Sequence, residues 1–117
     1  GHQAPRQGPS CQETERTRTM ITWSPRGDRR RHACVEYIAA ESCDWETAWR
    51  WEDAVFAAVE RLEEFPLSGR VVPEFGRRDI REVICGDYRI IYRVKRKQPE
   101  VISVRHGHFP IRSLRSL

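Results

Sequence analysis

The side chains of this sequence that are best suited to chemistry are arginines and histidines near its C-terminal end. Arg89 and Arg93 stand four residues apart, and Arg105 is followed by His106 and by His108. A guanidinium group binds phosphate or carboxylate through two parallel hydrogen bonds. An imidazole that titrates near neutral pH can move the protons that RNA cleavage requires. The pattern fits phosphate binding, RNA cleavage or binding to an acidic partner, and end-of-strand histidines would look the same.

Metal binding is poorly supported by the same residues. Two histidines two residues apart supply two ligands, whereas a zinc site needs three or four. The four cysteines contain no Cys-x-x-Cys pair, which argues against a zinc site and against a disulfide framework; they are Cys11, Cys34, Cys43 and Cys85. We expect no metal, no cofactor and reduced thiols, as in a cytoplasmic protein.

Charge is distributed unevenly along the chain. The net charge of +4 combines +4 in residues 1–31, −7 in residues 32–65 and +7 in residues 66–117, and 19 of the 21 cationic residues are Arg. A GC-rich genome would explain the choice of Arg, but it would not explain where the cations lie. No run of eighteen apolar residues and no secretory signal is present, so the sequence predicts neither a membrane span nor export.

The domain boundaries follow from composition. Residues 1–19 hold few apolar side chains, so we expect a flexible tail, a tag or upstream residues there. Met20, the single methionine, is a candidate for the natural translation start. Residues 20–112 are long enough for one small domain, and residues 113–117 are expected to form a C-terminal tail.

Two helices are expected in the first half of that domain. Ser24-Pro25 begins a helix that runs to about residue 41, and its first half, up to His32, lacks an apolar stripe and should be solvated or touch a partner. Asp44 caps a second helix that ends before Pro66. Its buried stripe is expected to contain Trp45, Ala48, Trp51, Val55, Ala58, Val59, Leu62 and Phe65.

The second half of the domain alternates with a period of two residues and is expected to form strands. These strands are expected at 80–85, 88–94 and 101–106, joined by a hairpin turn at Gly86-Asp87 and by a longer turn at 95–99. A short strand at 20–23 is expected to join the sheet edge. The sequence thus predicts an α+β fold: an N-terminal strand and a two-helix hairpin packed on one face of a three- to four-stranded antiparallel sheet.

The hairpin turn also predicts which way each strand residue points. Val83, Cys85, Tyr88, Ile90 and Val94 should face the helices. The opposite face should be exposed, and it should contain Ile80, Glu82, Ile84, Arg89, Ile91 and Arg93. Glu82 lies diagonally opposite Arg89 and Arg93, so these arginines are expected either to form a weak surface ion pair or to bind phosphates or an acidic partner.

Several motifs in order resemble the RelE/ParE superfamily of bacterial toxins. They are Leu62-Glu-Glu-Phe-Pro-Leu-Ser-Gly-Arg-Val-Val-Pro-Glu74, Arg81-Glu-Val, Tyr88-Arg-Ile-Ile-Tyr-Arg-Val94 and Val101-Ile-Ser-Val-Arg-His-Gly107, and the resemblance spans about residues 20–110. The resemblance implies a type II toxin–antitoxin system in which a cognate antitoxin wraps the toxin. It also implies two alternative activities: RelE-like members cut mRNA at the ribosome, and ParE-like members bind and inhibit DNA gyrase.

If the chain were a RelE-like nuclease, the resemblance would give Arg89 the scissile phosphate, Arg105 an electrostatic role and His106 the acid/base role. Two departures count against cleavage, because Glu82 stands where the nucleases tend to carry Lys and no Tyr follows Tyr92. The Val-Arg-His-Gly ending is also closer to ParE-like members.

We therefore expect a ParE-like toxin, with a RelE-like nuclease as the alternative. Its partner-binding or phosphate-binding residues are expected to be Arg70, Arg81, Arg89, Arg93 and His108. The expected partners are a cognate antitoxin and either gyrase or the ribosome with its mRNA. A homodimer is a further open expectation.

Overall fold

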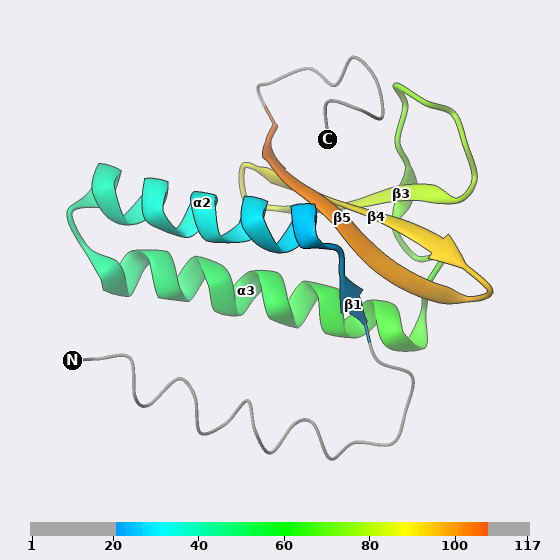
Figure 1. Ribbon diagram of the computed structural model, residues 1–117, viewed down its shortest axis with the longest axis horizontal. Coiled ribbons are helices and arrows are strands. Elements are labelled where there is room, and N and C mark those ends of the chain that lie inside the picture. The colour runs from blue at the N-terminus through cyan, green and yellow to red at the C-terminus, as the bar shows by residue number, and fades with distance from the viewer. Residues whose placement is uncertain (1–20, 108–117) are drawn as a thin grey trace.

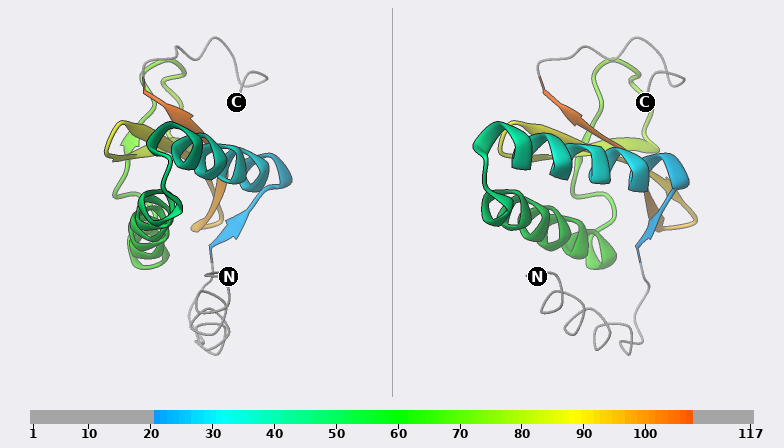
Figure 2. Two further views of the ribbon diagram at one scale, coloured as in Figure 1. Left: turned by 90° about the vertical axis from the view of Figure 1, so that its left-hand side faces the viewer. Right: turned by 60° about the vertical axis from the view of Figure 1, so that its left-hand side comes forward.

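The computed structural model describes residues 21–107. The expectations for residues 1–20, for His108 and for the C-terminal tail at 113–117 therefore lie outside the described residues. The elements of the structure are β1 (Thr22–Trp23), α2 (Pro25–Ser42), α3 (Trp45–Glu64), β2 (Arg70–Val71), β3 (Ile80–Cys85), β4 (Tyr88–Lys95) and β5 (Gln98–His106). The two helices run side by side in opposite directions on one side of the sheet (Figure 1, Figure 2).

The predicted α+β class and the placement of the helices are confirmed, but the sheet differs from the one expected. It has five strands in the order β1-β5-β4-β3-β2, rather than three to four. β1 pairs with β5 in parallel, while the other neighbouring strands are antiparallel. The additional strand, β2, is two residues long and lies in a segment that reads as loop, so period-two alternation could not reveal it.

Both helices begin at the expected capping residues. The Ser24 hydroxyl accepts a hydrogen bond from the backbone N–H of Gly27 at 2.9 Å, and Pro25 occupies the first helical position. The Asp44 carboxylate accepts from the N–H of Glu46 at 3.1 Å. These caps satisfy donors that have no partner inside the helix.

The centre of the predicted α3 stripe is buried, but its two ends are not. Five residues of the stripe are buried, namely Ala48, Val55, Ala58, Val59 and Leu62. Trp45 is 51% exposed and Phe65 is 61% exposed, so their predicted burial was wrong. The helix end that carries Trp45 extends past the sheet (Figure 1), where no strand lies beneath it to cover the ring.

The first half of α2 was expected to be solvated or to touch a partner, and part of it packs inside the domain instead. Gly27 is buried against the strand β5, and a Cβ atom there would lie 2.4 Å from the Val101 carbonyl oxygen. The Arg31 side chain is 12% exposed, covers the rings of Trp23 and Phe56, and pairs with acidic residues of both helices. A cation whose guanidinium lies over rings and also pairs with acids does not add to an apolar stripe, so the sequence pattern does not reveal its burial.

The register of the β3–β4 hairpin is as predicted. Cys85 lies opposite Tyr88 and Ile84 lies opposite Arg89, and Gly86 has the positive φ of 62° that such a turn favours. The next turn is tighter than expected. β4 continues to Lys95 and β5 begins at Gln98, which leaves a two-residue turn in place of the predicted turn over 95–99.

The sheet face away from the helices was expected to be exposed, and most of it is covered. Val72, Ile80 and Ile91 are fully buried in a second, smaller core, together with the partly buried Phe75 and Ile102. The connection between β2 and β3 supplies Val72 and Phe75 to this core. A loop with so few apolar residues gives no periodic signal, which is why the alternation alone predicted an open face.

Tyr92 fixes the preceding connection, between α3 and β2, to the sheet. Its hydroxyl donates to the Pro66 carbonyl at 2.8 Å and accepts from the Gly69 N–H at 2.9 Å. Gly69 is needed for this close approach, because a Cβ atom there would lie 2.5 Å from the Tyr92 hydroxyl. The Arg81 side chain donates to the Gly69 carbonyl at 2.8 Å and to the Leu67 carbonyl at 3.2 Å.

Replacing Tyr92 with Phe should lower the free energy of unfolding by about 1–3 kcal/mol, because it leaves the buried Gly69 N–H without a partner. Urea denaturation followed by circular dichroism measures the change. Tyr37→Phe is the matched control, since that ring is 58% exposed. Equal stabilities of the two variants would contradict the anchoring role of the Tyr92 hydroxyl.

Candidate functional site

Four charged side chains form one ion-pair cluster on the sheet face away from the helices. We use the name ion-pair cluster for Arg70, Glu74, Glu82 and Arg89. Arg89 donates from Nε to Glu82 Oε1 at 2.6 Å, and from Nη1 and Nη2 to the two oxygens of Glu74 at 2.9 Å each. The other Glu82 oxygen accepts from the Nε atom of Arg70. The cluster therefore joins β2, β3, β4 and the β2–β3 connection.

Burial within the cluster increases from its rim to its centre. The Glu82 side chain is 0% exposed and that of Arg89 is 10% exposed, whereas Glu74 is 31% and Arg70 is 62% exposed. A buried carboxylate is tolerated only where it is paired, and Glu82 has a cation on each of its oxygens. The predicted pairing of Glu82 with Arg89 is therefore present, but as a buried contact rather than a weak surface one.

The cluster perturbs the acid–base equilibria of its members. The hydrogen bonds from Arg89 hold the pKa of the Glu74 carboxyl at about 2, against an ordinary value of 4.5. The same contacts, with those to Glu82, raise the pKa of Arg89 above its ordinary value, although burial acts in the opposite direction. Both groups thus stay charged over the pH range in which the protein works, and the pair is locked in its ionised form.

A shallow pocket of about 390 Å³ opens beside this cluster. Its walls come from the β2–β3 connection, from the β3–β4 hairpin and from the end of β5. It is lined by Arg70, Pro73, Glu74, Ile84, Gly86, Asp87, Tyr88, Arg89 and Gly107. Cationic and acidic side chains line it in equal number, so it is not a basic pocket.

Arg105 lies next to the cluster and His106 lies on the other side of the sheet. Arg105 is directly opposite Arg89 on the neighbouring strand. Burial lowers the pKa of Arg105, and the positive charges of Arg30 and Arg89 lower it further. His106 is opposite Tyr88, and its ring packs edge-on against the Tyr88 ring at 5.1 Å between centroids. Tyr88 belongs to the helix-facing core. Strand alternation thus separates His106 from Arg89 and Arg105.

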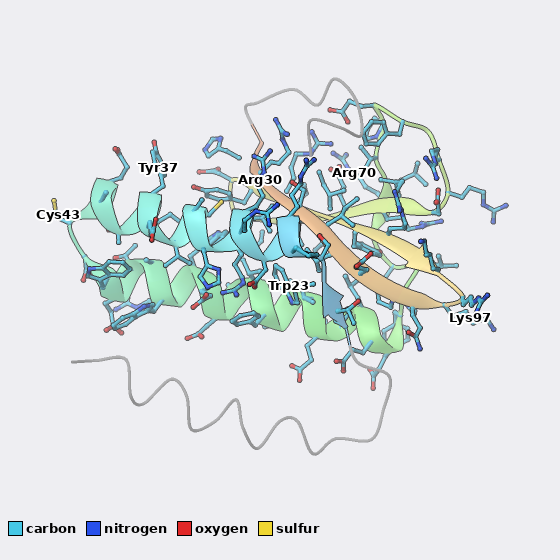
Figure 3. The ribbon with its side chains drawn as sticks, viewed as in Figure 1. Trp23, Arg30, Tyr37, Cys43, Arg70 and Lys97 are labelled. Atoms are coloured by element: carbon cyan, nitrogen blue, oxygen red, sulfur yellow. The ribbon has the colours of Figure 1, made fainter. Side chains whose placement is uncertain are left out.

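The other predicted site residues are dispersed. Arg70 lies at the rim of the pocket (Figure 3). Arg81 binds loop carbonyls, as described above. Arg93 is half-buried near the far end of β4, opposite Ile80. The structure therefore brings together Arg70, Arg89 and Arg105 from the predicted set, and it does not bring Arg81, Arg93 or His106 to them.

Glu74 is the cluster member that sequence reasoning missed. It lies in the β2–β3 connection, fifteen residues before Arg89, so no periodic pattern links the two. The Val-Val-Pro-Glu run that carries it was noted only as part of the resemblance. Val72 was a weak signal, because it is an apolar residue in a stretch that otherwise reads as loop, and it proves to be buried in the second core.

A second depression, apolar and about 430 Å³ in volume, lies between the C-terminal half of α3 and the edge of the sheet at β3. We call it the α3–β3 groove; it is lined by Ala58, Arg61, Leu62, Phe65, Ser68, Gly69, Arg70, Glu82, Val83 and Ile84. β2 pairs with Arg81 and Glu82 alone, so within residues 21–107 the outer edge of β3 has no strand partner from Val83 onward.

Neither α2 nor α3 combines the length and the apolar character that crossing a membrane requires. Within residues 21–107, no three His, Cys, Asp or Glu side chains cluster in a way that could hold a metal ion.

The sequence of this chain matches a known protein family. The family described as ParE toxin of type II toxin-antitoxin system, parDE, matches residues 21–109. A protein of Sinorhizobium fredii (strain NBRC 101917 / NGR234) named "Putative toxin Y4kP" is 36% identical over 95 residues, which covers 79% of this chain and 92% of that protein.

A solved structure described as the chromosomal ParDE TA system from P. aeruginosa has the same fold. It superposes with a TM-score of 0.63 at 14% sequence identity, over 75% of this chain and 95% of that one. The family match spans the whole described region, so the chain belongs to the ParE toxins of type II toxin–antitoxin systems.

Proposed function

We propose that this toxin acts by binding a protein target, DNA gyrase, without cleaving RNA, and that a cognate antitoxin neutralises it. The proposal rests mainly on the contacts that the Arg89 guanidinium makes within the domain. All three of its donor nitrogens are engaged by Glu82 and Glu74. A nuclease would need that guanidinium free to stabilise the charge that develops on the scissile phosphate.

The charge around Arg89 also disfavours RNA. The two cations of the ion-pair cluster are matched by two carboxylates, so the cluster is neutral as a unit. A phosphodiester approaching Arg89 through the pocket would meet Glu74, which a pKa of about 2 keeps negative. Displacing Glu74 would also break two charge-assisted hydrogen bonds, which are among the stronger ones in proteins.

Groups that could move protons near Arg89 are poorly suited to the task. A carboxylate with a pKa of about 2 is a weak base. Burial raises the pKa of Tyr88 above its ordinary value, which makes its phenol harder to ionise. His106, the residue that the resemblance to nucleases would make the acid or base, lies on the opposite sheet face. None of these three groups is therefore suited to the acid–base role that RNA cleavage requires.

The α3–β3 groove is the surface that we assign to the antitoxin. It is apolar at its centre, and Phe65 and Ile84 at its borders are 61% and 53% exposed. The open edge of β3 beside it offers unpaired backbone groups that an added strand can bind. An extended or amphipathic segment would bury these apolar side chains and complete the sheet edge at the same time.

The target is tested with the purified chain in two assays. We expect inhibition of DNA supercoiling by gyrase, and no cutting of mRNA in a translation extract programmed with a defined message. The same chain with excess antitoxin is the control for both assays. Cutting of mRNA at ribosomes by a chain that leaves supercoiling intact would reject the gyrase proposal.

The structural role of Arg89 is tested by removing the buried ion pair whole. Arg89→Met alone should destabilise the fold by about 3–5 kcal/mol, because Glu82 loses its buried partner. Glu82→Leu combined with Arg89→Met should recover most of that stability and also gyrase inhibition. The readouts are chemical denaturation and supercoiling. A double variant that is stable but inactive would show that Arg89 contacts the target or a phosphate directly.

The antitoxin surface is tested with Ile84→Lys, which places a charge in the α3–β3 groove. Affinity for the antitoxin, measured by calorimetry, should fall about tenfold or more, as expected for a buried apolar contact replaced by a charge. The variant should still inhibit gyrase, and the antitoxin should no longer prevent that inhibition. Tyr37→Ser is the control, since it removes an exposed aromatic ring outside the groove. Unchanged affinity of the Ile84 variant would place the antitoxin elsewhere.

A further inference from the structure

The turn between β4 and β5 carries three consecutive cations at the end of the sheet. We define the cationic tip as Lys95, Arg96 and Lys97, all of them exposed. Lys97 lies at the outermost end of the hairpin and points away from the domain (Figure 3). Arg89 lies near the other end of the same strand, so the cationic tip is separate from the ion-pair cluster.

The backbone of this turn is unfavourable for the residues that occupy it. Arg96 has φ of 53° and Lys97 has φ of 64°. A two-residue turn with both residues in this left-handed region is the type that favours Asn-Gly, because a larger side chain crowds its own backbone there. Strained positions of this kind tend to be kept where they serve a function.

Electrostatics adds a second cost that nothing within the described residues offsets. Three adjacent cations repel one another, and no ion pair joins any of them to an acid within residues 21–107. Asp79 lies close by, since its carbonyl accepts from the Val94 N–H, but its carboxylate is engaged by Arg77 at 2.8 Å. The tip is therefore a projecting, uncompensated positive charge.

We propose that the cationic tip binds the phosphate backbone of duplex DNA. A protein partner would need an apolar centre to the contact, and none of the large exposed apolar side chains lies in the turn or beside it in β4 and β5. Binding to a phosphate backbone needs only clustered cations on a surface that can follow a strand. The choice of duplex DNA over RNA rests on the proposed function, because gyrase works on duplex DNA.

The sharpest test replaces Arg96-Lys97 by Asn-Gly. This variant removes two cations and supplies the residues that the turn favours, so its melting temperature should rise while its binding to DNA weakens. Binding is measured by the fluorescence anisotropy of a labelled DNA duplex over a range of salt concentrations. The affinity of the variant for DNA should be about tenfold lower, and the slope of log affinity against log salt concentration should be smaller in magnitude by about 1.8. Rising stability with falling affinity excludes unfolding as the cause.

The matched control is Arg29→Gln combined with Arg50→Gln, which removes two exposed cations from the helices and leaves the tip intact. This control should bind DNA almost as the natural chain does. Equal losses in both variants would overturn the proposal, because net charge alone would then explain binding. Stronger competition by an RNA duplex or by polyglutamate than by DNA would overturn it too. The gyrase proposal is tested separately, by the supercoiling assay on the natural chain, so the two proposals can fail independently.

Discussion

The buried contact between Arg89 and Glu82 is the constraint on which the sheet and its covering loop depend. Glu82 has no exposed surface, so its charge is tolerable only with Arg89 in place on the neighbouring strand. Arg89 in turn holds Glu74 with two hydrogen bonds, which draws the β2–β3 connection over the sheet. That connection brings Val72 onto Ile80 and Ile91 and closes the second core. One ion pair thus secures the face that the helices leave open.

The same pairing is the basis of our proposal that the chain binds a protein target and does not cleave RNA. An arginine at this place on the sheet is better able to hold a phosphate when no carboxylate engages its nitrogens. Here two carboxylates occupy them, one from β3 and one from the loop, and strand alternation carries His106 to the other side. The pocket that remains is small and mixed in charge. The surfaces to which we assign function lie at the margins of the sheet, where within residues 21–107 the edge of β3 is open and where the β4–β5 hairpin projects.

Local signals in the sequence were enough to predict the helices, the hairpin register and the family. Ser24 and Asp44 are capping residues, and Gly86 supplies a positive φ, so each acts within a few residues of its own position. The alternation also placed Arg89 and Glu82 correctly on the face away from the helices. It could not show that this face is covered, because the cover comes from a loop whose contacts depend on two apolar residues, Val72 and Phe75.

The remaining differences come from contacts between distant parts of the chain. Gly27 and Gly69 look like flexible or turn positions, whereas each is required because another element approaches too closely for a side chain. Glu74 meets Arg89 only after the loop has folded back. For the site, the resemblance pointed to Arg89, but the two carboxylates that surround it could be found only in the structure.

One irregularity in β5 governs the composition of both sheet faces. Tyr92 pairs with Val101 and Ile91 pairs with Ser103, so Ile102 is an extra residue in the ladder, a β-bulge. Beyond it the alternation of β5 is shifted by one, which turns Val104 inward to the helices and leaves Arg105 beside Arg89. Losing Ile102 would leave these pairings in place and make the ladder regular, but it would remove from the second core a side chain that packs there. The bulge thus lets β5 place one more side chain on the face away from the helices than a regular strand of the same span could.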